Sequence, residues 1–217
     1  MVGKTTLYTY LHEDKKNGGS LYLSCRYSLR YTKRRLSKPT KWSKRKSIEE
    51  RPKCIDLQQR IGDFEMDTIV GGGQSGTILT LVERRTGYAM LEKLPEGKNA
   101  KALASAVNRR LSFAKRRGQL FSITTDNGSE FAKFKTIERA LKIPVYFAKP
   151  YCSNDKPHIE HLNGLIRQYI PKGVDIEKVT DSEVRRIERE LNRRPRKKIN
   201  YKTPFEVFYL NLKRCCT

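Results

Sequence analysis

The chain has 217 residues and is strongly basic, with 46 Lys and Arg residues against 23 Asp and Glu residues. Its formal charge of +23 favours phosphate-rich partners, because basic side chains neutralise phosphates and release their counterions. No stretch approaches the ~20 apolar residues of a membrane-spanning helix, and the first residues lack the apolar core of a signal peptide. We therefore expect a soluble cytoplasmic protein without a membrane partner, associated with the nucleoid when it binds DNA.

The N-terminal part, residues 1–60, is predicted to be a basic arm. Residues 26–53 contain twelve basic residues and only two acidic ones, and their apolar residues keep no period, which favours an extended or poorly packed segment. Ahead of it, Thr5–Leu11 predicts a short helix that ends at the turn Lys16–Gly19. The five cysteines include no C-x-x-C pair, so neither a disulfide framework nor a zinc ribbon is predicted.

Residues 61–217 are predicted to form one α/β domain. Apolar runs bounded by turn residues predict five strands, at Phe64–Val70, Ile78–Glu83, Tyr88–Lys93, Leu120–Thr125 and Val145–Ala148. Helical spacing of apolar residues predicts helices over Lys98–Arg117, Glu130–Leu141, Ile159 to Pro171, Val184–Asn192 and Pro204–Leu210. We expect a mixed five-stranded sheet flanked by helices.

Three acidic residues stand where this order of elements would bring them together. Asp67 and Asp126 end strand-like runs, and parallel neighbouring strands would place both at one edge of the sheet, where ligands of α/β folds gather. Glu160 opens the third helix, whose face could deliver it to the same edge. Such carboxylates suit Mg²⁺, and two ions could activate a water or a 3′-hydroxyl. An acidic cluster in a basic chain predicts an enzyme that cuts or joins nucleic acid backbones.

Other interpretations of these residues remain open from the pattern alone. A strand-terminal aspartate is often a turn or helix cap, and a glutamate in a first helical turn can simply complement the helix dipole. Strand alternation puts Asp63 and Glu65 on the same face as Asp67, so the pattern does not choose among the three. The pair His158 and His161 could bind metal, but no cysteine pair at zinc-finger spacing precedes it.

The motifs around these acids resemble the acidic-triad (DDE) transposases of bacterial insertion sequences, and most closely the "insertion sequence thirty" family. Asp126 stands in Thr-Thr-Asp-Asn-Gly, Glu160 follows it after 33 intervening residues, and Asn163–Tyr169 comes shortly after. The run Tyr201–Val207 also resembles the family, so the resemblance covers roughly Ser47–Leu210.

The resemblance implies a ribonuclease H-like integrase core that cleaves and transfers DNA strands at element ends, in DNA transposition, recombination and integration. It selects Asp67, with Asp126 and Glu160, as catalytic residues and as ligands of two Mg²⁺ ions, with Mn²⁺ as a substitute. The implied partners are double-stranded DNA, as element ends and target, and further copies of the chain in a homo-oligomer. Met1–Leu11 matches only the last helix of the family's helix-turn-helix region, so we expect an N-terminally truncated chain.

Further residues are predicted to contact DNA or to support the metal ligands. Asn127, Asn163 and Arg167 lie close to the three acids in sequence. Five basic residues follow the fourth helix without an intervening acid and are expected to contact phosphates: Arg193, Arg194, Arg196, Lys197 and Lys198. Two rival functions stay open, a metal-dependent nuclease without strand transfer and a truncated, inactive remnant that binds DNA and interferes with a full-length transposase.

Overall fold

The computed structural model describes residues 3–24, 45–74, 76–94, 97–150, 152 and 155–214. The chain divides into two compact units, residues 1–42 and residues 43–217. The second unit thus begins before the predicted boundary at residue 60. Residues 25–44, which include most of the predicted basic segment 26–53, lie outside the described residues.

The first unit contains helix α1 (Lys4–Lys16) and the 3-10 turn η1 (Leu21–Ser24). The helix is longer than the predicted Thr5–Leu11, and it ends where Gly18 adopts a left-handed φ of 80°. Lys15 and Lys16 lie in its last turn, where positive charge is favourable to the helix dipole.

The second unit is built on a six-stranded mixed sheet with the strand order β1-β6-β5-β2-β3-β4. The strands are β1 (Lys46–Ser47), β2 (Asp63–Val70), β3 (Thr77–Glu83), β4 (Ala89–Leu94), β5 (Ser122–Thr125) and β6 (Val145–Phe147). β2, β3 and β4 are antiparallel, whereas β2, β5, β6 and β1 are parallel neighbours. All five predicted strands are present. The sixth strand, β1, corrects the predicted number, and its two residues carry no pattern that could have announced it.

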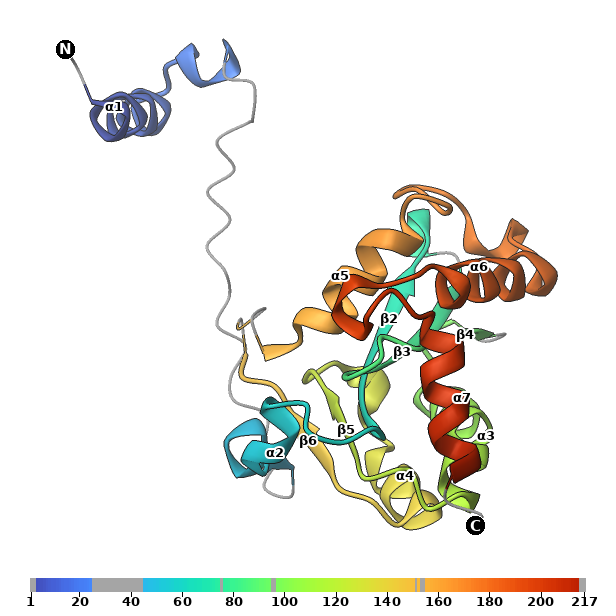
Figure 1. Cartoon of the computed structure of the whole chain (residues 1–217). Helices are drawn as coiled ribbons and strands as arrows, with labels where there is room; N and C mark the ends of the chain where they lie inside the picture. Colours follow the sequence, from blue (N-terminus) through green and yellow to red (C-terminus); the bar gives the residue numbers. More distant parts are fainter. Residues whose placement is uncertain are drawn as a thin grey trace. The chain divides into compact units, whose positions relative to one another are not determined.

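Helices connect and cover these strands (Figure 1). The α-helices of the second unit are α2 (Lys53–Asp56), α3 (Ala100–Arg116), α4 (Phe134–Leu141), α5 (Pro157–Ile166), α6 (Asp181–Arg193) and α7 (Pro204–Arg214). The 3-10 turns are η2 (Ile48–Glu50), η3 (Gly72–Gln74), η4 (Ser129–Phe131), η6 (Ile176–Lys178) and η7 (Lys197–Ile199). The predicted helix Glu130–Leu141 is split into η4 and α4. Among the described residues, none of the helices is long and apolar enough to span a membrane.

The sheet separates two apolar cores, and strand alternation decides which side chain enters which. Phe64 and Met66 of β2 join the core formed with α3, α4 and α7, where Phe208 stacks on Tyr88 at 4.4 Å. Ile69 joins the core formed with α5 and α6. Each fully buried Leu, Ile or Phe side chain contributes roughly 1.5–3 kcal/mol to folding. The odd-numbered residues of β2, which include its acids, therefore face α5 and α6.

Candidate active site

Two of the predicted acids meet at one edge of the sheet. β2 and β5 are parallel neighbours with Glu65 opposite Thr124, so Asp67 in the middle of β2 and Asp126 directly after β5 come close together. The buried Lys156 ammonium joins them, because its Nζ lies 3.3 Å from Asp126 Oδ2 and 3.8 Å from Asp67 Oδ2. One cation thus balances two carboxylates.

The carboxylate of Asp67 is held on both sides. Its Oδ1 accepts a hydrogen bond of 2.8 Å from the Thr68 backbone N–H, and its Oδ2 accepts one of 3.0 Å from the Asn163 side-chain amide. Burial raises the pKa of Asp67 and the charges of Asp126 and Glu130 raise it further, while Lys156 and the Thr68 bond lower it. Burial therefore disfavours the ionised form of Asp67, and Lys156 partly offsets this effect.

The loop after β5 fixes the direction of Asp126. Its Oδ1 accepts a hydrogen bond of 2.8 Å from the Gly128 N–H, and a Cβ at Gly128 would lie 2.6 Å from the end of the Glu130 side chain, which would have to move. The side chain of Asn127 donates to the Ala148 carbonyl at 2.8 Å. It also accepts a bond of 3.0 Å from Arg45 Nη1. The structure thus places Asn127 as an anchor of the loop that carries Asp126.

Helix α5 and the residue before it present one polar stripe toward the acidic edge. Lys156, Glu160, Asn163 and Arg167 follow one another at spacings of four, three and four residues, which lie on one face of a helix. Lys156 and Asn163 both reach Asp67, and the Arg167 Nη2 donates to the Val70 carbonyl at 3.0 Å. Glu160 lies between them on this stripe.

The third predicted acid is on the stripe but not in contact with the other two. The Glu160 side chain is exposed. In the part of the chain that the structure describes, no three His, Cys, Asp or Glu side chains group closely enough to hold a metal ion. The structure therefore brings Asp67 and Asp126 together and leaves Glu160 on the adjacent helix face.

The predicted phosphate-binding residues fall into two groups. Arg194 donates to the Tyr169 hydroxyl and covers its ring at 5.6 Å, Arg196 donates to the Leu191 carbonyl at 3.3 Å, and Lys198 donates to the Arg84 carbonyl at 2.9 Å. These three side chains bind the protein itself. The remaining two, Arg193 and Lys197, are exposed at the surface, as Arg194 and Lys198 also are.

No protein-family model matches the sequence. The transposase for insertion sequence element IS4351 of Bacteroides fragilis is 42% identical over 211 residues, which are 96% of this chain and 64% of the relative. The probable transposase for insertion-like sequence element IS1161 of Streptococcus salivarius is 37% identical and is matched over 94% of this chain and 58% of its own length. The curated homologues of this chain are insertion-sequence transposases.

The insertion sequence thirty branch is among these homologues. Transposase InsI for IS30A of Escherichia coli (strain K12) is 34% identical over 74% of this chain and 41% of the relative. The chain thus spans less than two thirds of the length of these transposases. The catalytic core domain of BIV integrase has a TM-score of 0.52 with this structure at 18% identity, covering 71% of this chain and 98% of that domain. The fold is therefore the ribonuclease H-like fold of an integrase core, as the sequence predicted.

The other acids of β2 bind partners away from Asp126. Asp63 accepts bonds from Arg60 at 2.8 Å and from Ser122 at 2.6 Å. Glu65 is fully buried and pairs with Arg84 at 3.3 Å. Of the three acids on this strand face, Asp67 is the one beside Asp126.

Lys156 is the functional residue that sequence reasoning missed. It stands three residues before the predicted start of the third helix and was not among the predicted site residues. One lysine among 46 basic residues gives no signal of its own. The available signal was its place four residues before Glu160, on the helix face that was predicted to cover the acids.

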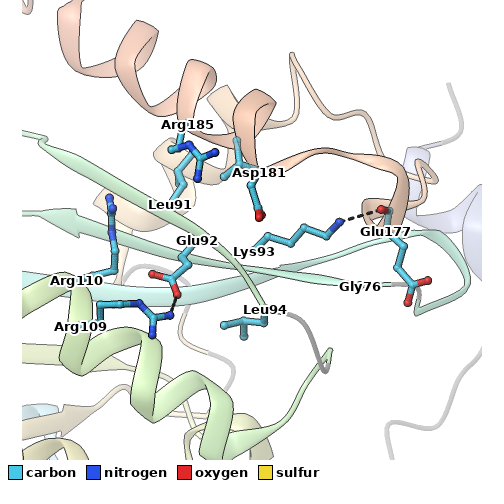
Figure 2. Close-up of a pocket in the computed structure, with 11 residues that line it drawn as sticks. Gly76, Leu91, Glu92, Lys93, Leu94, Arg109, Arg110, Glu177, Asp181 and Arg185 are labelled. Carbon is cyan, nitrogen blue, oxygen red and sulfur yellow. Dashed lines mark hydrogen bonds and ion pairs between the residues drawn. The ribbon is translucent and has the colours of Figure 1, made fainter.

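A cavity of about 610 Å³ opens elsewhere, along the outer strand β4 and against α3 and α6 (Figure 2). Its wall contains paired charges: Arg109 forms an ion pair with Glu92, and the Lys93 ammonium donates to the Glu177 carbonyl at 2.8 Å. None of the predicted site residues lines this cavity. It is therefore distinct from the acidic edge between β2 and β5.

Proposed function

We propose that this chain is the catalytic part of a transposase that cleaves DNA strands at insertion-sequence ends and transfers them to target DNA. The observation that carries the proposal is the pair of aspartates at the sheet edge, Asp67 and Asp126, bridged by one buried ammonium group. The homologous transposases and the integrase fold support the same reaction class. Glu160 is the third acid, because it lies between two residues that already reach Asp67.

The chemistry of the donors suits a divalent metal ion, with two carboxylates together and the third on the adjacent helix face. Carboxylate oxygens are the ligands that Mg²⁺ prefers, and Mn²⁺ accepts the same ligands. The Lys156 ammonium beside both aspartates shows that a positive charge is favourable at this place, and burial raises the pKa of Asp67. Asp67, Asp126 and Glu160 would hold two Mg²⁺ ions. When bound, the ions would polarise the scissile phosphate and activate the attacking hydroxyl.

The remaining parts of the site position these ligands and bind the substrate. The Asn163 amide orients Asp67, and the Asn127 side chain anchors the loop of Asp126. The exposed Arg193 and Lys197 contact phosphates of double-stranded DNA, which is the expected partner of a chain with a charge of +23. We also propose that the protein acts as a homo-oligomer, because two element ends have to be processed together.

The triad is tested by removing one charge at a time. Asp67→Asn, Asp126→Asn and Glu160→Gln keep the shape of each side chain, and each is expected to reduce Mg²⁺-dependent DNA cleavage by more than about 100-fold, the upper range for residues that only support metal ligands. DNA binding should be kept or strengthened, because repulsion between carboxylate and phosphate falls. Cleavage is measured on labelled duplex DNA, and binding is measured on the same duplex.

Glu190→Gln is the matched control, because Glu190 is an acid on α6 that pairs with Arg186 on the protein surface. It should cleave like the wild type. A triad variant that cleaves at a near-normal rate would remove that residue from the proposed metal site.

A further inference from the structure

Glu65 connects the strand of Asp67 to the helix of Glu160. It lies on β2 two residues before Asp67 and exposes no surface to solvent. Its Oε2 accepts a hydrogen bond of 2.8 Å from the backbone N–H of Ile159, the residue immediately before Glu160. One buried carboxylate therefore touches the backbone next to one proposed metal ligand and shares a strand with another.

The bond satisfies a group that the start of α5 would otherwise leave without an acceptor. The first N–H groups of a helix have no partner within the helix, and buried ones need an acceptor. Lys156 at the helix start forms no side-chain cap to the described residues, and Pro157 has no N–H to donate. Glu65 provides the acceptor from the neighbouring strand. A negative charge at this end of α5 is also favourable to the helix dipole.

The charge of Glu65 is balanced inside the protein rather than by the proposed metal site. Its Oε1 lies 3.3 Å from Nε of Arg84, which is itself buried and lies 3.8 Å from Asp56. Arg51 pairs with the same Asp56 and donates to the Thr124 hydroxyl at 3.0 Å, so the network extends to β5. Buried ion pairs are a weak source of stability, because desolvation offsets most of their attraction. The ion pairs around Glu65 are better explained by the fixed geometry that they impose on its side chain.

We propose that Glu65 is a positioning residue that fixes the first turn of α5 against β2 and so sets the distance between Glu160 and Asp67. Its function is to make the two ligands available to the same divalent ions. The proposal rests on the proposed function, since it needs both residues to bind metal. Glu65 itself touches neither substrate nor metal.

Glu83 offers a matched control for the effect of altering a buried carboxylate. It is also fully buried and accepts backbone hydrogen bonds, from Gly62 at 3.1 Å and Thr86 at 2.7 Å. These bonds close the turn between β3 and β4 and hold the start of β2. They do not involve α5.

The test shortens each carboxylate by one methylene in the full chain. Glu65→Asp keeps the charge opposite Arg84 but cannot reach the Ile159 N–H, so Mn²⁺ binding should weaken about 10-fold or more, as for other residues that orient metal ligands. Hydrogen exchange at the first turn of α5 should become faster. Glu83→Asp should lose comparable thermal stability and yet keep wild-type Mn²⁺ affinity. Mn²⁺ binding is measured by calorimetry without DNA.

A second variant separates reach from charge. Glu65→Gln keeps the length of the side chain and an oxygen that can accept from Ile159, so its Mn²⁺ affinity should lie closer to the wild type than that of Glu65→Asp. The reverse order would overturn the proposal, because charge would then matter more than position. If Glu65→Asp does not fold, the Mn²⁺ affinities of Glu65→Gln and Glu83→Gln are compared instead. Equal affinities support the proposal. A loss of Mn²⁺ affinity in Glu65→Gln alone contradicts it.

Two outcomes distinguish this proposal from the function on which it rests. Wild-type Mn²⁺ binding that disappears in Asp126→Asn, together with unchanged binding in Glu65→Asp, would overturn the positioning role alone. Failure of the wild type to bind Mn²⁺ would overturn the proposed function and the positioning role with it. Equal losses in Glu65→Asp and Glu83→Asp would show that both residues act only through general stability.

Discussion

A single lysine carries much of the electrostatics at the acidic edge. Lys156 is buried, and its ammonium lies within 4 Å of both Asp67 and Asp126. Two carboxylates this close repel one another, and the repulsion is strong where water is excluded. The ammonium thus stabilises the metal-free site, and a divalent ion would compete with it for the same oxygens.

Replacing the ammonium should make the fold depend on metal. Lys156→Met keeps the length of the side chain, and we expect it to lower the free energy of unfolding in EDTA by about 1–3 kcal/mol, the usual range for a disrupted buried interaction. Added Mn²⁺ should then stabilise the variant more than the wild type. The measurement is chemical unfolding with and without Mn²⁺. Lys135→Met, which removes an exposed ion pair with Glu138, is the control. Equal stabilisation of both variants by Mn²⁺ would contradict the idea that Lys156 and the metal ion compete for the same carboxylate oxygens.

The residues of the site were predictable to different degrees. Asp126 directly follows an apolar strand and Asp67 lies inside one, so their approach could be foreseen from the parallel order of β2 and β5. The position of Lys156 could not be foreseen, because its contact with the two aspartates depends on the angle at which α5 begins. The exposed position of Glu160 also depends on side-chain packing that no local pattern encodes. The proposed role of Glu65 could not be predicted from the sequence. Strand alternation placed Glu65 on the same face as Asp67 but did not indicate that it accepts a hydrogen bond from Ile159.

Helix α5 shows what local patterns define at the scale of an element. Its apolar spacing was correct, since Ile159, Leu162 and Ile166 are buried against the sheet. Its predicted end at Pro171 was wrong, because the helix ends at Ile166 and the chain tightens, with Tyr169 donating to the carbonyl three residues back. Strand β1 was not predicted at all. Its two residues form a strand only by pairing with β6, which is distant in sequence.

The start of α5 should make stability depend on pH. His158 is partly buried and its Nε2 accepts from the Gln58 amide at 2.8 Å, an arrangement that requires a neutral ring. Burial, together with the nearby charges of Lys198, Arg84, His161 and Arg51, lowers the pKa of His158 from 6.5 to about 4. The unfolded chain therefore binds the proton more readily, so this residue's contribution to stability decreases as pH falls from about 6.5 to about 4.

Variants can isolate this contribution. Across that pH range in EDTA, the free energy of unfolding of His158→Gln should fall by about 1–2 kcal/mol less than that of the wild type. This difference is smaller than the full shift in the pKa of His158 would give, because the ring is partly exposed to solvent. Stability is measured by urea unfolding at each pH. His161→Gln, at the exposed neighbouring histidine, should keep the wild-type pH dependence. Identical pH profiles for His158→Gln and the wild type would contradict the assignment.

Charge and fold divide the whole molecule into parts with different tasks. Residues 1–42 contain ten Lys and Arg residues and two acidic residues, so the first unit is a basic segment attached to a folded core. In the core, Asp67 and Asp126 lie where β5 ends, and the exposed Arg193 and Lys197 lie at the end of α6 and in η7. The order of strands and helices predicted a mixed α/β sheet flanked by helices, and the resemblance to DDE transposases implied the integrase fold. The positive charge of the chain was evident from the sequence, but the residues that bind the protein itself were not. The contacts of Arg194, Arg196 and Lys198 depend on tertiary packing.

The most direct test of the proposed transposase function is a strand-joining assay with the full chain, a short duplex that ends in a free 3′-hydroxyl, and a supercoiled plasmid. With Mg²⁺, the account predicts covalent joining of the labelled duplex to the plasmid, and EDTA should abolish it. A plasmid that is cut without joining would instead show a nuclease. Binding of the plasmid without cutting or joining would show a DNA-binding remnant, and either result would contradict strand transfer by this chain.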